Sequence, residues 1–545
     1  MIGESERIVV IGGGIAGLAT SALLARDGHR VTLLEARDEL GGRAGRWEHH
    51  GFRFDTGPSW YLMPEVFDHF FRLLGTSAAE QLDLVRLAPG YRVHAEGYDE
   101  PLDLRATRAD NVALFESIEP GAGAALEDYL DSAASAYDIA RRRFLYTNFD
   151  DPRNLLSGEV LRQAGRLAKL LATPLDRFAA RAVRDRRLQQ VLGYPAVFLG
   201  SSPDSTPAMY HLMSHMDLEQ GVFYPQGGFA GLIDRIVGLA ERAGVDIVTG
   251  ARVEEIELSG DARPAVAGAR FRDSTGRSVV APAHRVVSTA DLHHTETELL
   301  PRAVRTYPEE WWRRRTSGPG AVLAMLGIRG RVPGLEHHTL FFTDDWSRNF
   351  GAIFGADPHV PDPASFYVCM PSATDPTVAP EGDTNLFVLV PVPADTAIGR
   401  GGIDGTGDRL VEETADRAIA RIAEVSGLPD LAERIVVRRT VGPADFAEDL
   451  NSWQGGALGP AHTLRQSAFL RGSNRSRRVD GLYYAGGSSV PGIGLPMCLI
   501  SAENVLKRVR GDRSAGPVAE PEASGALETA GPAGGPGTAP DAARA

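Results

Sequence analysis

The chain begins with two short apolar runs separated by a helical pattern. Residues 8–11 and 31–34 are runs of mostly β-branched or leucine residues, a composition typical of buried parallel strands. Between them, Leu18, Leu23 and Leu24 recur at helical spacing. The order of strand, helix and strand within about 30 residues predicts the first unit of a parallel sheet.

Helical and strand patterns alternate along most of the remaining chain. Helices are predicted over residues 64–74, 111–140 with a break at Pro120-Gly121, 155–190, 230–243 and 409–426. Strands are predicted as a hairpin over 86–104, and over 245–248, 251–256, 285–291, 322–328, 386–390 and 482–485. This alternation predicts an α/β protein.

Three glycines after the first strand have the spacing of a dinucleotide-binding turn. Gly12 permits a tight turn, Gly14 lets backbone N–H groups approach a pyrophosphate, and Gly17 lets the helix pack closely on the strand. Glu35 ends the second strand, where a carboxylate accepts hydrogen bonds from ribose hydroxyls. A glycine turn without a ligand is the alternative, but it leaves the ordered strands, helix and acid unexplained. The stretch predicts a bound dinucleotide.

The residues after Glu35 indicate which dinucleotide binds. Ala36-Arg37 and then Gly41-Gly42-Arg43 follow, and Gly57-Pro58 comes shortly afterwards. An E-A-R-x-x-x-G-G-R arrangement resembles the flavoproteins of the glutathione-reductase and amine-oxidase type, in which this loop wraps the flavin side of FAD and the arginine lies near its phosphates. A plain surface arginine is the alternative. FAD is therefore the predicted cofactor.

Composition excludes several classes of protein. The net charge of −14 argues against a nucleic-acid partner, which selects a basic surface. The two cysteines, Cys369 and Cys498, are far apart, which excludes a disulfide scaffold and fits a reducing cytoplasm. No signal peptide and no apolar run long enough to span a membrane are expected. The histidine pairs at 293–294 and 337–338 are interpreted as non-metal sites, because adjacent side chains point in different directions.

Residues 155–190 form a basic amphipathic stretch on an otherwise acidic chain. Arg162, Arg166 and Lys169 are among its basic residues, and Leu161 and Leu171 among its apolar ones. Such a stretch can dock on anionic lipid headgroups. The alternative is the solvated outer face of a helical domain.

Near the C-terminus, the sequence GLYYAGGSSVPGIGLPMCLISAEN predicts a strand, a glycine-rich turn and a helix. Together with GGGIAGL, DTGPS and MYHLMSHMDLEQGVFYPQGG, this block resembles bacterial-type phytoene desaturases over residues 7–509. Ser489-Val490 and Ile493 depart from that pattern, since many members carry Thr-His and a small residue there. In such enzymes, the dipole of the last helix stabilises negative charge on the reduced flavin.

The resemblance implies an α/β fold with a discontinuous, glutathione-reductase-like Rossmann FAD-binding domain and an inserted mixed α+β substrate domain. The expected FAD-binding segments are 1–75, 226–300 and 478–510, the substrate domain is 76–225 and 301–477, and residues 511–545, rich in Gly, Ala and Pro, are expected to be a disordered tail. The residues expected to contact FAD are Gly12, Gly14, Ile15, Ala16, Gly17, Glu35, Ala36, Arg37, Gly42, Arg43, Gly57, Pro58, Val253, Ala290, Gly486, Gly487, Gly494, Leu495 and Pro496.

The implied reaction is dehydrogenation of an allylic C–C bond in a long, lipophilic polyene, with phytoene to lycopene as the expected conversion. Alternatives are a thirty-carbon dehydrosqualene desaturase, a carotenoid oxidase, ketolase or isomerase, an amine oxidase, or a non-catalytic prenyl carrier. By placement, Glu159 and Arg162 match an acid and arginine implied to assist proton transfer; a surface ion pair is the alternative. The resemblance also implies a quinone or oxygen as electron acceptor and peripheral contact with the inner face of the cell membrane, and leaves the oligomeric state open.

Overall fold

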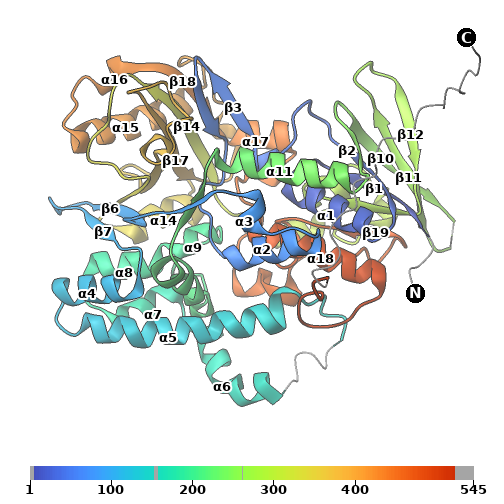
Figure 1. Ribbon diagram of the computed structural model, residues 1–545, viewed down its shortest axis with the longest axis horizontal. Helices are drawn as coiled ribbons and strands as arrows, with labels where there is room; N and C mark the ends of the chain where they lie inside the picture. The colour runs from blue at the N-terminus through green and yellow to red at the C-terminus, as the bar shows by residue number, and fades with distance from the viewer. Residues whose placement is uncertain (1–4, 152–157, 261, 522–545) are drawn as a thin grey trace, which may run out of the picture.

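The computed structural model describes residues 5–151, 158–260 and 262–521 of the 545-residue chain. Two sheets lie side by side in the upper part of the molecule in Figure 1, and a group of helices lies below one of them. Segments from both ends of the chain meet in the same layer, because α1 and the last helix, α18, lie next to each other. This mixture of a parallel sheet with helices and a second sheet confirms the predicted α/β class.

A five-stranded parallel sheet carries the first glycine-rich turn. Its strand order is β19-β13-β1-β2-β9. The strands are β1 (Arg7–Ile11), β2 (Arg30–Leu34), β9 (Asp246–Val248), β13 (Arg285–Ser288) and β19 (Leu482–Tyr484). They come from three separate parts of the chain, each within a predicted FAD-binding segment. Because all four pairings are parallel, the carboxyl ends of the strands share one edge of the sheet.

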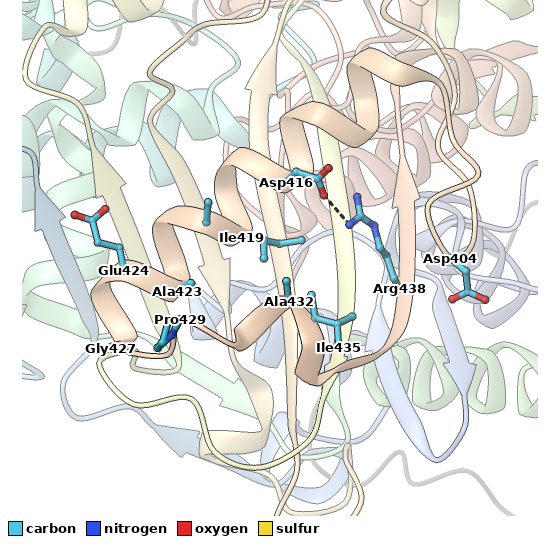
Figure 2. Close-up of a pocket in the computed structure, with 11 residues that line it drawn as sticks. Asp404, Asp416, Ile419, Ala423, Glu424, Gly427, Pro429, Ala432, Ile435 and Arg438 are labelled. Carbon is cyan, nitrogen blue, oxygen red and sulfur yellow. Dashed lines mark hydrogen bonds and ion pairs between the residues drawn. The ribbon is translucent and has the colours of Figure 1, made fainter.

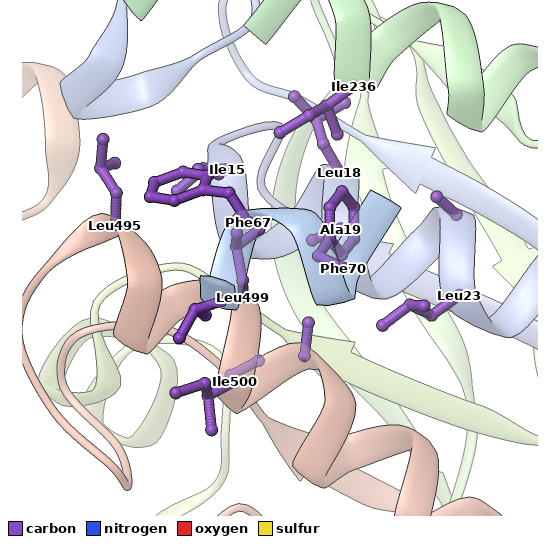
Figure 3. Close-up of a cluster of buried hydrophobic side chains, with 14 of the residues drawn as sticks. Ile15, Leu18, Ala19, Leu23, Phe67, Phe70, Ile236, Leu495, Leu499 and Ile500 are labelled. Atoms are coloured by element: carbon purple, nitrogen blue, oxygen red, sulfur yellow. The ribbon is translucent and has the colours of Figure 1, made fainter. Parts of the chain in front are cut away.

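Four helices pack around one hydrophobic core beside this sheet. They are α1 (Ile15–Arg26), α2 (Pro64–Leu73), α11 (Gly228–Arg242) and α18 (Leu495–Arg510). Figure 3 shows Leu18 of α1, Phe67 of α2 and Leu499 of α18 within one cluster. Leu18 is fully buried, and its neighbours in α1 are buried on all sides. The N- and C-terminal parts of the chain therefore fold as one unit.

Three smaller sheets surround the parallel sheet. One is antiparallel and consists of β10 (Arg252–Ser259), β11 (Ala265–Arg272) and β12 (Ser278–Pro282). The other two are antiparallel pairs, β3 (Arg46–His49) with β4 (Phe52–Asp55), and β5 (Leu84–Arg86) with β8 (Phe223–Pro225). The last pair joins residues far apart in sequence and links the two parts of the molecule.

A seven-stranded sheet forms the second layer, in the order β18-β14-β17-β16-β15-β6-β7. Its strands are β6 (Tyr91–Ala95), β7 (Leu102–Leu104), β14 (Gly320–Ile328), β15 (His338–Phe342), β16 (Phe366–Cys369), β17 (Thr384–Val392) and β18 (Ile435–Val441). Only the β15–β6 pairing is parallel within this sheet. Helix α15 (Arg409–Ser426) covers one face, and its bounds are those predicted. The predicted hairpin at 86–104 appears as β6 and β7.

The helical part contains α4 (Arg108–Ile118) and α5 (Ala122–Ala140), separated at the predicted Pro120-Gly121 break. The single basic helix expected over 155–190 is instead divided into α6 (Gly158–Ala172), α7 (Leu175–Ala182) and α8 (Arg186–Gly193). Pro174 and Asp185 are the N-cap residues of α7 and α8, so the helical stretch is interrupted just before each of these two helices. Among the described residues, no helix is both long enough and apolar enough to cross a membrane.

The segment after α18 is ordered further than the sequence predicted. Residues 511–521 lie against α18, where Lys507 Nζ donates to the carbonyl oxygens of Ser514 and Gly516, each at 2.7 Å. The N–H of Val518 donates to Glu503 at 2.6 Å. Lys507 and Glu503 therefore provide hydrogen-bond partners for backbone groups of the segment after α18, which its amino-acid composition did not predict. Residues 522–545, the rest of the predicted tail, lie outside the described residues.

Candidate cofactor site

The turn between β1 and α1 is shaped as a cradle. The N–H of Gly12 donates to the carbonyl of Leu34 at 2.8 Å, which joins the ends of β1 and β2. A Cβ at Gly17 would lie 1.9 Å from the Gly12 carbonyl oxygen, so this position admits only glycine. At Gly14, by contrast, the nearest heavy atom would be 3.8 Å away. A Cβ at Gly14 would therefore fit at ordinary contact distance, whereas Gly17 is used in packing.

Ile15 and Ala16 start α1 directly behind this turn, and both are buried. The N–H groups in the first turn of a helix have no partner within the helix, and they carry the positive end of its dipole. An N-terminus that follows a glycine turn is a binding site for a pyrophosphate.

Glu35 lies beside the position expected for the ribose of the dinucleotide. Its Oε2 accepts from the N–H of Gly13 at 2.6 Å, and its Oε1 accepts from the N–H of Arg37 at 2.8 Å. Each carboxylate oxygen keeps a further lone pair for a ribose hydroxyl. Ala36, which lies between Glu35 and Arg37 in the sequence, is half-buried, and the Arg37 side chain is exposed. This held, buried carboxylate fits the predicted dinucleotide.

A second glycine loop closes against the first. The N–H of Gly41 donates to the Gly13 carbonyl at 2.9 Å, and Gly42 lies so close that a Cβ on it would be 3.3 Å from the Gly14 Cα. Gly42 has a φ of +57°, in the left-handed region that favours glycine. The two loops therefore lie against each other at Gly14.

Arg43 is half-buried, and its side chain bonds to a distant loop. Its Nε donates to the Ala457 carbonyl at 2.9 Å, and its Nη2 donates to Ser452 Oγ at 2.8 Å. Burial lowers its pKa. A Cβ at Gly57 would lie 2.2 Å from the Arg43 carbonyl oxygen, and the half-buried Pro58 follows. In this structure, Arg43 ties the loop to residues 452–457.

The C-terminal glycines meet the N-terminal ones. A Cβ at Gly486 would lie 3.6 Å from the Ala16 Cβ, and the N–H of Gly486 donates to Ser501 Oγ at 3.0 Å. The carbonyl of Gly487 accepts from Arg471 Nη2 at 2.5 Å. Glycine loops from the two ends of the chain therefore line one site.

Helix α18 begins at this site. Gly494, with a φ of +115°, precedes it, and Leu495 and Pro496 are its first residues. The proline fits the first turn because an N–H there has no helical partner. The N-termini of α1 and α18 thus both serve a site built from glycine loops, an arrangement that favours the negative charge of a pyrophosphate and of a reduced flavin.

The remaining two predicted contacts lie on neighbouring segments. Ala290 follows β13, and its backbone nitrogen would be 3.4 Å from a Cβ at Gly12. Val253 lies in β10, two residues after Ala251, whose N–H donates to the Glu35 carbonyl at 2.7 Å. Ala290 is thus placed at the first glycine turn. Val253 is adjacent to the Glu35 end.

The predicted catalytic pair is not brought to these loops. Arg162 is exposed on α6, and its Nε donates to the Gly158 carbonyl at 3.2 Å. The side chain of Glu159 lies outside the described residues. Figure 1 places α6 at the lower edge of the molecule, whereas α1 and α18 lie in its right half. A catalytic role for this pair stays a prediction.

Two buried polar groups near the site had not been predicted. Arg471 has its pKa lowered to about 10 by burial and holds three backbone carbonyls of the C-terminal loops, those of Gly487, Pro460 and Ser489. Finding it requires knowing that residue 471 folds against residues 487–489. In the sequence, Arg471 is simply one of several arginines between residues 465 and 478, and the others are exposed in the structure.

The second unpredicted group is Asp217, inside the motif MYHLMSHMDLEQG. Its Oδ2 accepts from the hydroxyls of Tyr194 at 2.6 Å and Tyr91 at 3.1 Å, and its Oδ1 has no partner among the described residues. Burial raises its pKa to about 7. Tyr91 in turn packs on Trp60, two residues after Pro58, with ring centroids 5.3 Å apart. A wall of aromatic rings therefore runs from the cofactor loops to a buried acid.

A hollow of about 1010 Å³ lies elsewhere, between α15 and β18 (Figure 2). Ile419, Ala423 and Ile435 line it, and Asp416 pairs with Arg438 at 2.7 Å at its rim. Its lining residues all fall between 404 and 438, so it shares none with the predicted cofactor site.

Comparisons with known proteins identify the family of the chain. Residues 15–509 match the family described as flavin containing amine oxidoreductase. The chain is 42% identical over 92% of its length to a carotenoid 3,4-desaturase from Haloarcula japonica, covering 98% of that protein. It is 34% identical over 93% of its length to a zeta-carotene-forming phytoene desaturase from Myxococcus xanthus, covering 94% of that protein.

A crystal structure of an oxidoreductase from Methanosarcina mazei has the same fold, with a TM-score of 0.57, 16% identity, and coverage of 92% of this chain and 100% of that one. The family match, the glycine cradle and the ribose-binding position of Glu35 together identify FAD as the cofactor. The chain therefore belongs to the flavin-containing amine oxidoreductases and, within them, to the carotenoid desaturases, which are oxidoreductases acting on CH–CH groups.

Proposed function

We propose that this chain introduces a double bond into a forty-carbon carotenoid at its 3,4 position. The observation that carries this choice is the 42% identity, over 98% of its length, to a relative named for 3,4-desaturation. Phytoene to lycopene, the conversion expected from the sequence, is the second candidate, and the 34% identical phytoene desaturase favours it. Both reactions are dehydrogenations of a long polyene, so they need the same kind of site.

When bound, FAD supplies the oxidant that takes up the two hydrogens lost in a desaturation. The chain contributes the surroundings. The Gly14 loop and Glu35 would hold the cofactor's pyrophosphate and ribose, and the α18 N-terminus would stabilise negative charge on it. Trp60, packed on Phe198 with ring centroids 5.3 Å apart, offers an apolar wall that excludes water from a hydrocarbon. We further propose a quinone or oxygen as the final electron acceptor.

A pigment assay in two hosts separates the candidates. Each double bond added in conjugation shifts the absorption of the polyene to longer wavelength. Expression in a lycopene-accumulating host should yield a red-shifted pigment, while a phytoene-accumulating host stays colourless. Colour appearing in the phytoene host would instead establish the second candidate. A flavin-loaded protein that changes neither pigment would overturn both.

We also propose that the enzyme reaches its substrate at the surface of the cell membrane, on the inner side. Support comes from an exposed group that we call the apolar edge: Leu464, Phe469 and Leu470, with exposed fractions of 49%, 61% and 43%. Arg465 is exposed beside it. Exposed apolar side chains next to a cation suit the interface of an anionic bilayer, where a polyene dissolves.

A further inference from the structure

A buried group of metal-ligating side chains lies inside the seven-stranded sheet, where β15 begins and β16 ends. His338 starts β15, Cys369 ends β16, and the two are directly paired across antiparallel strands. Paired residues in an antiparallel sheet project from the same face. His337 precedes the strand, and its ring centroid lies 4.6 Å from that of His338. The sequence interpretation that these adjacent histidines diverge is therefore wrong, because His337 is not in strand geometry.

The three side chains present their donor atoms to one another. One nitrogen from each histidine and the Cys369 sulfur all lie within 4.8 Å of one another. The three residues are at most 4% exposed. The Nε2 atoms of both histidines have no hydrogen-bond partner among the described residues. Buried polar atoms are nearly always paired, so an unpaired nitrogen on each of two neighbouring buried histidines points to a ligand.

Hydrogen bonds on the far side of each ring orient these nitrogens. His337 Nδ1 lies 2.8 Å from Thr374 Oγ1, and His338 Nδ1 lies 2.7 Å from the Tyr367 hydroxyl. Each hydroxyl oxygen can accept from Nδ1–H, which leaves the Nε2 lone pair free. The Tyr367 hydroxyl is in turn 2.7 Å from Ser59 Oγ. Outer contacts of this kind accompany histidine ligands of metal ions.

We propose that His337, His338 and Cys369 bind one divalent cation of the zinc class. Two imidazoles and a thiolate are the ligands that Zn²⁺ prefers, whereas Mg²⁺ and Ca²⁺ take oxygen. Bond lengths of about 2.0–2.3 Å place tetrahedral ligand atoms about 3.3–3.6 Å apart. The donor atoms lie within 4.8 Å of one another, so they need to close by up to about 1.2–1.5 Å, which side-chain rotation has to supply. Binding transfers the Cys369 thiol proton to solvent, and water or a hydroxyl takes the fourth position.

The site is close to the cofactor loops but separate from them. Trp60 stacks on His338, with ring centroids 4.4 Å apart and an interplanar angle of 9°. A cation here would hold together the ends of β15 and β16, on which Trp60 packs. The proposal does not depend on which carotenoid is the substrate, since its test reads metal content rather than turnover.

The test uses the full-length, FAD-loaded chain, expressed with added zinc and then dialysed against a weak chelator. We expect about one Zn²⁺ per chain by elemental analysis. Co²⁺ exchanged into the site should give visible absorption beyond the flavin bands, with a thiolate-to-cobalt transition. A wild-type chain that holds no zinc and gives no cobalt spectrum, while its flavin content shows it folded, overturns the proposal.

Variants assign the ligands. Cys369→Ser and His338→Gln should each lower zinc content at least tenfold, whereas Cys498→Ser, which changes the only other cysteine, should leave it unchanged. Cys369→His replaces one zinc ligand with another and should retain zinc. Equal zinc in wild type, Cys369→Ser and His338→Gln would place the metal elsewhere and refute the site. If Cys369→Ser fails to fold, the cobalt–thiolate transition of the wild-type protein decides the question.

Discussion

Two glycines of one motif have different physical roles. Gly17 touches the backbone of Gly12, and a Cβ there would come within 1.9 Å of its carbonyl oxygen. At Gly14 a Cβ would meet Gly41 only at the ordinary contact distance of 3.8 Å, and the φ of Gly14 lies outside the left-handed region. The fold therefore requires Gly17, while only a ligand requires Gly14. This difference separates cofactor binding from folding.

Gly14→Ala should fold normally but lose FAD. The added methyl meets no protein atom closer than 3.8 Å, yet it occupies the path of the pyrophosphate. We expect flavin content, read from absorbance after purification, to fall at least tenfold while the circular dichroism spectrum stays unchanged. Gly17→Ala is the matched contrast and should lower soluble yield itself. Full yellow colour in Gly14→Ala would contradict the site.

Asp217 predicts a specific dependence of stability on pH. Burial raises its pKa from 3.8 to about 7, so between these values the folded state keeps a proton that the unfolded state releases. The free energy of unfolding contributed by this group therefore falls as pH rises through that window and stays low above it. The full effect is about 4 kcal/mol at most.

Asp217→Asn removes this titration but keeps an oxygen that accepts from Tyr91 and Tyr194. The melting temperature of the variant relative to wild type should therefore rise between about pH 5 and about pH 8. Asp128→Asn, at an exposed acid, is the control and should show no such trend. Parallel melting curves for Asp217→Asn and wild type across this range would show that Asp217 is already ionised when folded.

At the residue level, the sequence predicted those features of the site that depend on a local sequence pattern. The glycine spacing and Glu35 follow from a strand–helix–strand unit, and the structure places them together as expected. Arg471 and Asp217 could not be predicted, because their burial depends on segments distant in sequence. Arg43 shows the same limit: its position was predicted, but its bonds to residues 452–457 were not.

At the level of elements, periodicity predicted which segments are helices or strands better than it predicted which face of a helix is buried. Helix α15 has the predicted bounds, since an uninterrupted amphipathic pattern ends at Gly427. The basic stretch at 155–190 was predicted to be helical and amphipathic, with its exposed face either in contact with lipid headgroups or in solvent. In the structure, Leu167 and Leu170 of α6 pack inward, and Arg166 donates to Ser132 and Ser135 of α5. Part of that amphipathic face is therefore protein core.

Paired substitutions on α6 test this orientation. Leu167→Ala should lower the free energy of unfolding by about 2–5 kcal/mol, because the side chain is 7% exposed. Leu161→Ala, one and a half turns away and 57% exposed, should change it by less than about 0.5 kcal/mol. Denaturant titrations followed by fluorescence give both values. Equal effects would mean that α6 does not pack on α5 as described.

At the level of the whole molecule, the cofactor site depends on chain topology. The parallel sheet draws its strands from residues 7–34, 246–288 and 482–484, and the substrate-side sheet is built from the segments between. The family resemblance predicted this division, which no local pattern contains. Two contacts between distant segments accompany this division: β5 pairs with β8, and Gly486 lies next to Ala16.

The apolar edge predicts how the whole molecule meets a membrane. Burying Leu464, Phe469 and Leu470 in a bilayer interface contributes up to about 1.5–3 kcal/mol for each side chain, and about 1.4 kcal/mol changes a partition constant tenfold. Replacing all three by serine should therefore reduce flotation with anionic liposomes by about tenfold or more. Flavin content should stay unchanged, because none of the three is buried.

A matched control exists on other faces of the molecule. Val280 and Ile403 are 44% and 46% exposed, comparable with the apolar edge, but they lie on β12 and beside the hollow near β18. Val280→Ser with Ile403→Ser removes two apolar side chains of comparable exposed fraction and should leave flotation unchanged. Arg162→Gln with Lys169→Gln should weaken binding to anionic but not to neutral liposomes, because only the electrostatic part is lost. If the triple serine variant floats as well as wild type, the membrane-facing surface lies elsewhere on the molecule, and the substrate must enter from that side.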